Sequence, residues 1–205
     1  MSSQMKPNFK HERQLWHRRL NVAGADEVGR GALAGPIVAA AVVFPPAILK
    51  SKPGWVKQVR DSKKLMAKLR EQLYKKITQS SKWTVAVVSN TVIDKIGLQP
   101  ANILVINKAV KKLKHHPDYL LLDYVANFKS PTRFKTIIKG DSKVFSIACA
   151  AIVAKVYRDK LMVKLHKKYP QYKWAKNKGY GSWAHRQAIK KFGLSPLHRQ
   201  SFKIN

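Results

Sequence analysis

The stretch Val22-Ala23-Gly24-Ala25-Asp26-Glu27-Val28-Gly29-Arg30-Gly31 decides how the rest of the chain is interpreted. An apolar run typical of a β-strand ends here in two adjacent carboxylates, and a glycine-flanked arginine follows. Neighbouring side chains on a strand point to opposite faces, so one of Asp26 and Glu27 would be buried unless a common partner draws both together. Hard oxygen ligands suit magnesium or manganese. The pair therefore indicates half of a metal site, with Arg30 beside it to meet a phosphate backbone.

The composition predicts a polyanionic partner. The 205 residues include 41 lysines and arginines against 10 aspartates and glutamates, which gives a formal net charge of +31. Such a surface repels itself unless a polyanion neutralises it, and nucleic acid is the first candidate. A basic proteome or a lysine-rich solvated surface is the alternative explanation. An apolar fraction of 45% argues against disorder, and the length suits one domain with a full core.

The sequence predicts a cytoplasmic protein without a membrane partner. No apolar run is long enough to span a bilayer, and residues 1–19 are polar and basic, without the apolar centre of a signal peptide. The single cysteine, Cys149, lies in an apolar stretch and suits a buried thiol in a reducing compartment. The Cys and His spacing typical of zinc sites is absent.

Five apolar segments predict the strands of one sheet. Residues 21–25 and 36–44 are joined by a glycine-rich link too short for a crossover helix, so these two strands should be antiparallel. The second segment is continuously apolar, which is typical of a strand buried on both faces. The other predicted strands cover residues 83–89, 118–123 and 134–138.

Helical periodicity occurs between these strands. Leucines at i+4 spacing after Asp61-Ser62 predict a helix that begins there, with one of these two residues as its N-cap. Three further helices are expected from about residue 100 to the stop at 115–117, over 146–168, and over about 183–192. The order of elements predicts an α/β or α+β fold, a mixed sheet with helices on its faces.

Acidic residues follow three of the predicted strands. Asp26 and Glu27 come after the first strand, Asp123 ends the fourth, and Asp141 follows the fifth. If these strands are neighbours, four carboxylates meet in one cluster and resist joint ionisation. Two divalent cations about 3.5–4 Å apart would relieve this repulsion and activate water. The alternative is that each aspartate caps a helix or closes a turn, and it stays open for Asp141.

Seven segments, in order, carry recognisable motifs over about residues 20–202. They are residues 23–36, 61–65, 120–123, 139–143, 150–159, 178–182 and 195–202. Together they resemble the bacterial ribonuclease HII family, the type 2 ribonucleases H. An acidic-Gly-Arg-Gly match alone would be weak, but the ordered set is highly specific.

This resemblance implies a ribonuclease H-like fold, with a five-stranded mixed sheet flanked by helices and a C-terminal helical extension. It implies a monomeric endoribonuclease that hydrolyses the RNA strand of RNA–DNA hybrids. The family also cuts 5′ of ribonucleotides embedded in duplex DNA. The products carry 3′-hydroxyl and 5′-phosphate ends, because water is the nucleophile.

The resemblance also divides the chain and assigns its carboxylates. A basic leader (1–19), a catalytic core (20–168) and a substrate-binding helical and loop extension (169–205) are expected within one domain. The family's metal-binding catalytic residues correspond to Asp26, Glu27, Asp123 and Asp141. These would hold magnesium or manganese in a two-metal mechanism.

Recognition of the substrate transfers by position. Gly29-Arg30-Gly31 matches the family loop whose backbone meets the ribonucleotide and its 2′-hydroxyl, the group that distinguishes RNA from DNA. Tyr180 matches a tyrosine that packs against the sugar of the next deoxynucleotide. A tight turn and a core aromatic are the respective alternatives. The lysines expected along the duplex, each with a solvated surface position as its alternative, are Lys63, Lys143, Lys155 and Lys178.

Two positions depart from the family pattern, and two rival interpretations stay open. Tyr124 replaces a glycine that often follows the third carboxylate, and Ala151 replaces a serine. A noncatalytic basic nucleic-acid-binding protein would explain the charge, but not the carboxylates that close apolar strands. A type 3 ribonuclease H would be expected to have a long extra domain before the first motif, and only 25 residues precede Asp26 here.

Overall fold

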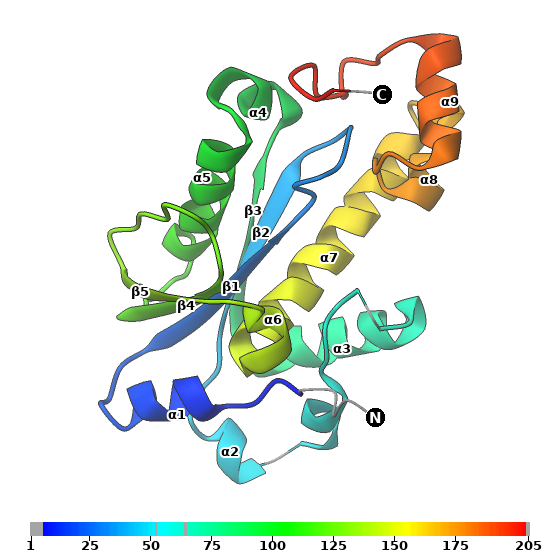
Figure 1. Ribbon diagram of the computed structural model, residues 1–205. Helices are drawn as coiled ribbons and strands as arrows, with labels where there is room; N and C mark the ends of the chain where they lie inside the picture. Colours follow the sequence, from blue (N-terminus) through cyan, green and yellow to red (C-terminus); the bar gives the residue numbers. More distant parts are fainter. Residues whose placement is uncertain (1–5, 52, 64, 204–205) are drawn as a thin grey trace.

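One five-stranded mixed sheet forms the centre of the protein, as the computed structural model shows for residues 6–51, 53–63 and 65–203 (Figure 1). The strands are β1 (Val22–Val28), β2 (Ile37–Val43), β3 (Lys82–Val88), β4 (Tyr119–Asp123) and β5 (Arg133–Ile137). Their order is β3-β2-β1-β4-β5. The pairs β1–β2 and β2–β3 are antiparallel, and β1–β4 and β4–β5 are parallel. All five predicted strands and the antiparallel first pair are confirmed.

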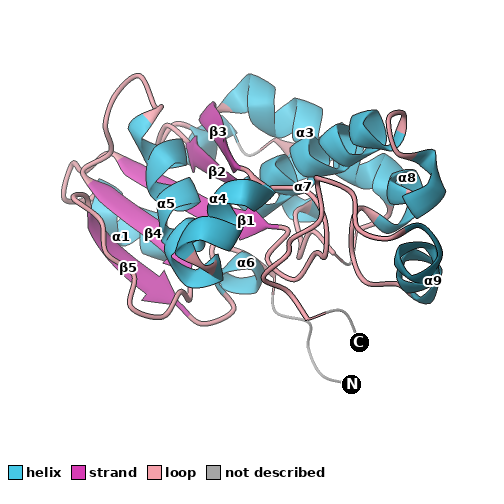
Figure 2. Ribbon diagram, turned by 90° about the horizontal axis from the view of Figure 1, so that it is seen from above, coloured by secondary structure: helices cyan, strands magenta, loops and turns pink. Residues whose placement is uncertain are grey.

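Helices cover both faces of this sheet and continue beside it. The helices of the described residues are α1 (Lys10–Trp16), α2 (Ile48–Ser51), α3 (Ala67–Ser80), α4 (Asn90–Ile96), α5 (Leu98–Lys111), α6 (Gly140–Lys143), α7 (Phe145–His166), α8 (Trp174–Asn177) and α9 (Trp183–Phe192), with 3₁₀ turns η1 (Gly54–Gln58) and η2 (Pro170–Tyr172). Helix α5 packs on one face of the sheet, and α7 and α3 on the other. Figure 2 shows α8 and α9 beside the sheet, near one end of α7.

The alternation of side chains along β2 explains its continuous apolar run. Ala39 and Ala41 belong to the core under α5, whereas Ala40 and Val42 belong to the core under α7. Both faces of the strand are therefore buried, as predicted. On β1, Gly24 permits an even closer approach, because a Cβ there would lie 2.3 Å from the backbone carbon of Ser146 in α7.

The N-terminal segment packs against the core. Helix α1 buries Glu12, whose Oε1 accepts a hydrogen bond from the Ser146 amide at 2.8 Å. Phe9 packs against Phe145 with tilted rings whose centroids are 4.2 Å apart. Residues 1–5 of the predicted leader lie outside the described residues.

The prediction that a helix begins at Asp61-Ser62 is wrong. Helix α3 begins at Ala67, and neither Asp61 nor Ser62 caps it. The preceding segment is instead a loop held by Arg70, whose guanidinium donates to the carbonyls of Ser62 (2.8 Å) and Leu65 (2.7 Å). Lys64 of this motif lies outside the described residues.

Helix α4 was not predicted at all. Its N-terminus is capped by Ser89, whose Oγ accepts from the Val92 amide at 3.3 Å.

Cys149 is a buried free thiol, as expected. Within the described part of the chain, no helix has the length and apolar character needed to cross a membrane.

Candidate active site

A cavity of about 430 Å³ opens at the C-terminal ends of the parallel strands. It is lined by Asp26, Glu27, Val28, Gly29, Arg30, Gly31, Ser62, Lys63, Asp123, Asp141, Ala151, Lys155 and Tyr180. All four predicted carboxylates, the glycine-flanked arginine loop, two of the four lysines and the tyrosine therefore share one space. The replacement at Ala151 faces this cavity as well.

Sheet topology explains why the carboxylates converge. Ala25 of β1 pairs with Leu122 of β4, which places Asp26 beside Asp123 at the same sheet edge. Asp123 in turn pairs with Ile137 at the end of β5, and Asp141 follows in the short helix α6. Parallel strands present their carboxyl ends together, so residues far apart in sequence meet here.

Two predicted lysines lie elsewhere. Lys143 ends α6 and does not line the cavity. The ammonium group of Lys178 folds back onto the carbonyl of Ala175, and its own carbonyl accepts from Arg158 at 2.9 Å. Lys155 lines the cavity while its Nζ lies 2.8 Å from Oδ1 of Asp159.

Asp26 is the most strongly perturbed carboxyl of the site. Burial raises its pKa well above the usual value, and the nearby charges of Glu27, Asp123 and Asp141 raise it further. Its Oδ1 accepts a hydrogen bond from the Glu27 amide at 2.8 Å. Among the described residues, no lysine or arginine comes within ion-pair distance of Asp26, Asp123 or Asp141. This crowding stays uncompensated within the described part of the protein.

Glu27 is held through a single oxygen. Its Oε1 accepts from Asn102 Nδ2 at 3.2 Å and lies 3.6 Å from Arg30 Nη1, whereas Oε2 has no hydrogen-bond partner among the described residues. Burial raises the pKa of Glu27, and Arg30 and Asn102 oppose that rise. Asn102 was missed by the sequence analysis. The only available signal was an amide on the apolar stripe of α5, where it is fully buried.

Asp123 ties the end of β4 to α6. Its Oδ1 accepts from the amides of Tyr124 (2.8 Å) and Gly140 (2.9 Å). Tyr124 is exposed, so its departure from the family pattern leaves Asp123 in place.

Burial, Asp123 and Asp61 together raise the pKa of Asp141, and Lys63 lowers it. Asp61, predicted as a helix cap, thus lies near the site instead.

The donor chemistry fits a hard divalent cation. The residues that line the cavity include four carboxylates and neither His nor Cys, and the mutual repulsion of the carboxylates is relieved when a cation binds. Throughout the described residues, no three His, Cys, Asp or Glu side chains are drawn together tightly enough to hold an ion as they stand. The cavity therefore presents four carboxylates around one space rather than a closed coordination shell.

Two buried arginines shape the loop beside these carboxylates. Arg199 donates to the carbonyls of Gly29 (2.6 Å), Arg30 (2.6 Å) and Gly35 (3.0 and 3.1 Å). Arg158 donates to those of Pro36 (2.9 Å), Ala34 (3.2 Å) and Lys178. Both guanidinium groups are fully buried, and burial beside Arg158 lowers the pKa of Arg199 to about 10. The sequence analysis placed both residues in motifs and expected Arg158 to lie along the duplex, but it did not predict that they hold this loop through its carbonyls.

Arg158 and Arg199 form a clamp on the loop, and this clamp determines which backbone groups of the loop can bind a ligand. The carbonyls of Gly29 and Arg30 are turned onto Arg199, whereas the amides of Arg30 and Gly31 donate to no acceptor among the described residues. Gly29 has φ +95°, and a Cβ there would lie 2.2 Å from Arg158 Nε, so the close approach requires glycine. The Tyr180 ring lies 5.3 Å from the Arg158 guanidinium and 5.9 Å from Lys155 Nζ.

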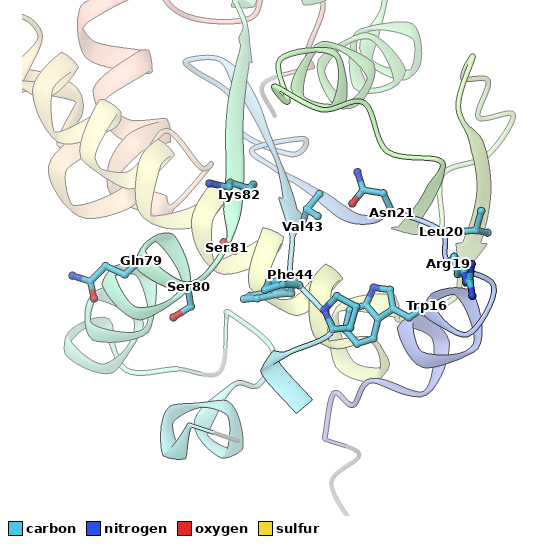
Figure 3. A pocket seen from close by; sticks show the side chains of 12 residues that line it. Trp16, Arg19, Leu20, Asn21, Val43, Phe44, Gln79, Ser80, Ser81 and Lys82 are labelled. Atoms are coloured by element: carbon cyan, nitrogen blue, oxygen red, sulfur yellow. The ribbon is translucent and has the colours of Figure 1, made fainter. Parts of the chain in front are cut away.

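A second cavity, of about 570 Å³, lies at the opposite end of the sheet (Figure 3). Trp16 and Phe44 lie next to each other along it, with Arg19 and Lys82 among its other lining residues. None of its lining residues carries a carboxylate. Of these two cavities, only the one at the C-terminal ends of the parallel strands is lined by carboxylates.

Comparison with known proteins agrees with this site. The family model described as Ribonuclease HII matches residues 23–205. Ribonuclease HII of Dehalococcoides mccartyi is 46% identical over 204 residues, covering 98% of this chain and 95% of that protein. The ribonuclease HII in the solved complex with PCNA from Archaeoglobus fulgidus has a TM-score of 0.74 and 25% identity, covering 91% of this chain and 96% of that one.

A more distant structure shares the fold. Bst ribonuclease HIII in complex with Mn²⁺ has a TM-score of 0.71 at 21% identity, covering 89% of this chain and 67% of that one. The match along almost the whole sequence, with the motifs gathered around one acidic cavity, settles the classification. This chain belongs to the ribonuclease HII family and is an endoribonuclease H, a phosphodiester hydrolase.

Proposed function

We propose that this enzyme cuts duplex DNA on the 5′ side of an embedded ribonucleotide, in addition to the RNA–DNA hybrid hydrolysis that characterises its family. We propose that magnesium or manganese is held by Asp26, Glu27, Asp123 and Asp141. The observation that carries this proposal is a cluster of four carboxylates, of which only Glu27 has a basic side chain within ion-pair distance among the described residues, beside a loop whose Arg30 and Gly31 amides have no acceptor there.

Each group of residues has a separate task in this proposal. Asp26, Glu27, Asp123 and Asp141 would hold two divalent cations, which would supply an activated water and charge stabilisation for the leaving 3′-oxygen, so that the ends would be 3′-hydroxyl and 5′-phosphate. Arg30 and Asn102 hold Oε1 of Glu27 and leave its Oε2 available as a ligand. Asp123 uses one oxygen to fix the turn at Gly140 and keeps the other for the cavity.

Recognition of the ribonucleotide comes from the loop and the tyrosine. The free amides of Arg30 and Gly31 are donors that can meet a 2′-hydroxyl or the adjoining phosphate. Tyr180 offers a flat ring to the sugar that follows, where a 2′-hydroxyl would fit badly. Lys63 and Lys155 at the rim contact phosphates without reading sequence.

The acidic cluster is tested by neutral substitution. Asp26→Asn and Asp123→Asn should abolish cleavage of a hybrid in magnesium while leaving hybrid binding intact. Glu71→Gln is a matched control, because Glu71 is 38% exposed and pairs with Lys160 away from the cavity. If either cavity variant cleaves at the rate of Glu71→Gln, the assignment of the carboxylates is wrong.

We propose that the protein acts as a monomer, because residues of a single chain line the entire cavity. We also propose a cytoplasmic location, which suits a nucleic-acid substrate and a free buried thiol at Cys149. Sedimentation at the concentration used for the cleavage assay tests the first of these statements.

A further inference from the structure

Two buried histidines connect the C-terminal tail to the backbone of Tyr180. His185 is fully buried in α9 and His198 is 1% exposed in the tail. Their Nε2 atoms lie 3.1 Å apart. Nδ1 of His185 lies 2.9 Å from the carbonyl oxygen of Tyr180, and Nδ1 of His198 accepts from the Ser195 amide at 2.9 Å. A continuous chain of hydrogen bonds thus runs from Ser195 to Tyr180.

At the Ser195 end of this hydrogen-bond chain, groups that can only donate hydrogen bonds determine which imidazole nitrogens carry a proton. The Ser195 amide is such a donor, so Nδ1 of His198 must carry a lone pair. The proton of a neutral His198 then resides on Nε2, which donates to Nε2 of His185. That acceptor also receives the indole N–H of Trp174 at 3.0 Å, and an indole nitrogen is a donor only.

The other end of the chain agrees with this assignment. With Nε2 of His185 accepting, its proton must lie on Nδ1, where it donates to the Tyr180 carbonyl. A carbonyl can only accept, so the direction of every bond is fixed. A second proton on either ring would set two donors against each other.

We propose that His185 and His198 are positioning residues for Tyr180: as a neutral pair with opposite tautomers, they hold its backbone beside the catalytic cavity. The inference rests on the proposed function, in which Tyr180 meets the sugar after the ribonucleotide. It adds that recognition of the RNA–DNA junction depends on two groups that never touch the substrate.

The surroundings favour neutral rings. Burial lowers the pKa of His185, and the Arg186 guanidinium lowers it further, against the opposing effect of the Tyr180 carbonyl. Burial and His185 lower the pKa of His198 to about 4. The aromatic rings of Tyr172 and Trp174 pack on both imidazoles, with centroids between 4.7 and 6.3 Å away. Both rings should therefore stay uncharged at neutral pH, and His198 should stay uncharged at mildly acidic pH as well.

Nitrogen NMR of the ¹⁵N-histidine-labelled protein tests the arrangement without reference to activity. We expect the Nε2–H tautomer for His198 and the Nδ1–H tautomer for His185 at neutral pH, with a pKa of about 4 for His198 and a pKa below the ordinary value of about 6.5 for His185. Assignment by single His→Asn variants identifies the two signals. Identical tautomers, or titration of either ring near its ordinary pKa of about 6.5, would overturn the inference.

Cleavage specificity tests the consequence for Tyr180. His185→Asn keeps an N–H donor near the position of Nδ1, whereas His185→Gln keeps an acceptor near Nε2 and loses that donor. His185→Gln should lower the preference for the RNA–DNA junction about tenfold, the worth of one hydrogen bond, with kcat on long hybrids retained. His185→Asn should rescue the preference.

This experiment distinguishes failure of the positioning role of His185 from failure of the proposed role of Tyr180. An unchanged preference in His185→Gln, beside a reduced one in Tyr180→Ala, which removes the ring, would refute the positioning role. If Tyr180→Ala itself keeps the preference, the proposed role of Tyr180 falls, and the NMR result alone decides whether the pair holds its backbone. Equal melting temperatures of His185→Gln and His185→Asn would exclude misfolding as the cause of any difference.

Discussion

Four carboxylates share one cavity and repel one another, so removing the charge of Asp26 should stabilise the metal-free enzyme. Asp26→Asn is nearly isosteric, and its Oδ1 can still accept the hydrogen bond that the Glu27 amide donates at 2.8 Å. The substitution removes one negative charge beside three others, of which only Glu27 has a basic side chain within ion-pair distance among the described residues. We therefore expect the variant to be more stable by about 1–2 kcal/mol in chelator at pH 8.

The sign of the pH dependence follows from the raised pKa of Asp26. The folded protein holds a proton that the unfolded chain releases, so this stability is complete below the unfolded pKa of about 3.9. It is lost as pH rises through the higher folded pKa. The stability advantage of Asp26→Asn over wild type should accordingly widen as pH rises through that range.

Thermal unfolding in chelator is the assay. A gain of 1–2 kcal/mol corresponds to a rise of roughly 2–8 °C in Tm for a chain of this size. Millimolar magnesium should reverse the order, because it stabilises the wild-type site and not the variant. An Asp26→Asn protein that melts below wild type in chelator at pH 8, while Glu71→Gln melts with wild type, would refute this account of the cavity.

Three further predictions concern the same site. Cleavage by wild type should rise with pH through the raised pKa values of Asp26, Glu27 and Asp141, since metal binding requires their ionised forms; a rate profile that is flat across acidic pH at a magnesium concentration well below saturation would contradict this. Gly29→Ala should destabilise the protein by about 2 kcal/mol or more, because φ is +95° and the Cβ meets Arg158, whereas Gly31→Ala, with no atom within 4 Å of the added Cβ, should melt with wild type. Arg199→Lys should lower hybrid cleavage at least about tenfold, since an ammonium cannot bridge three carbonyls as a planar guanidinium does; unchanged kcat/KM would show that the clamp is dispensable.

The sheet and its acidic edge were predictable because they depend on local pattern. Alternating or continuous apolar runs identified all five strands, and the short link between the first two fixed their antiparallel pairing. Asp26, Glu27 and Asp123 stood out because carboxylates are rare in this basic chain and end apolar segments. The convergence of three strand ends then followed from parallel pairing of β1, β4 and β5.

What could not be predicted depends on individual side-chain contacts, most of them distant in sequence. Before α3, which begins at Ala67, Arg70 holds a loop through the carbonyls of Ser62 and Leu65, a nearby contact that leucine spacing does not reveal. The roles of Arg158 and Arg199 arise from carbonyls more than 120 residues away. Asn102 reaches Glu27 across 75 residues of sequence. No periodicity or spacing encodes such partners.

The central claim is that the cavity uses divalent cations to cut at a ribonucleotide. The most direct measurement is cleavage of a DNA duplex that contains one ribonucleotide, with the cut position and the end groups mapped by mass. With magnesium or manganese we expect a single cut 5′ of the ribonucleotide, with 3′-hydroxyl and 5′-phosphate ends, and no cut in chelator. Cutting that persists in chelator, or a 2′,3′-cyclic phosphate end, would contradict the account.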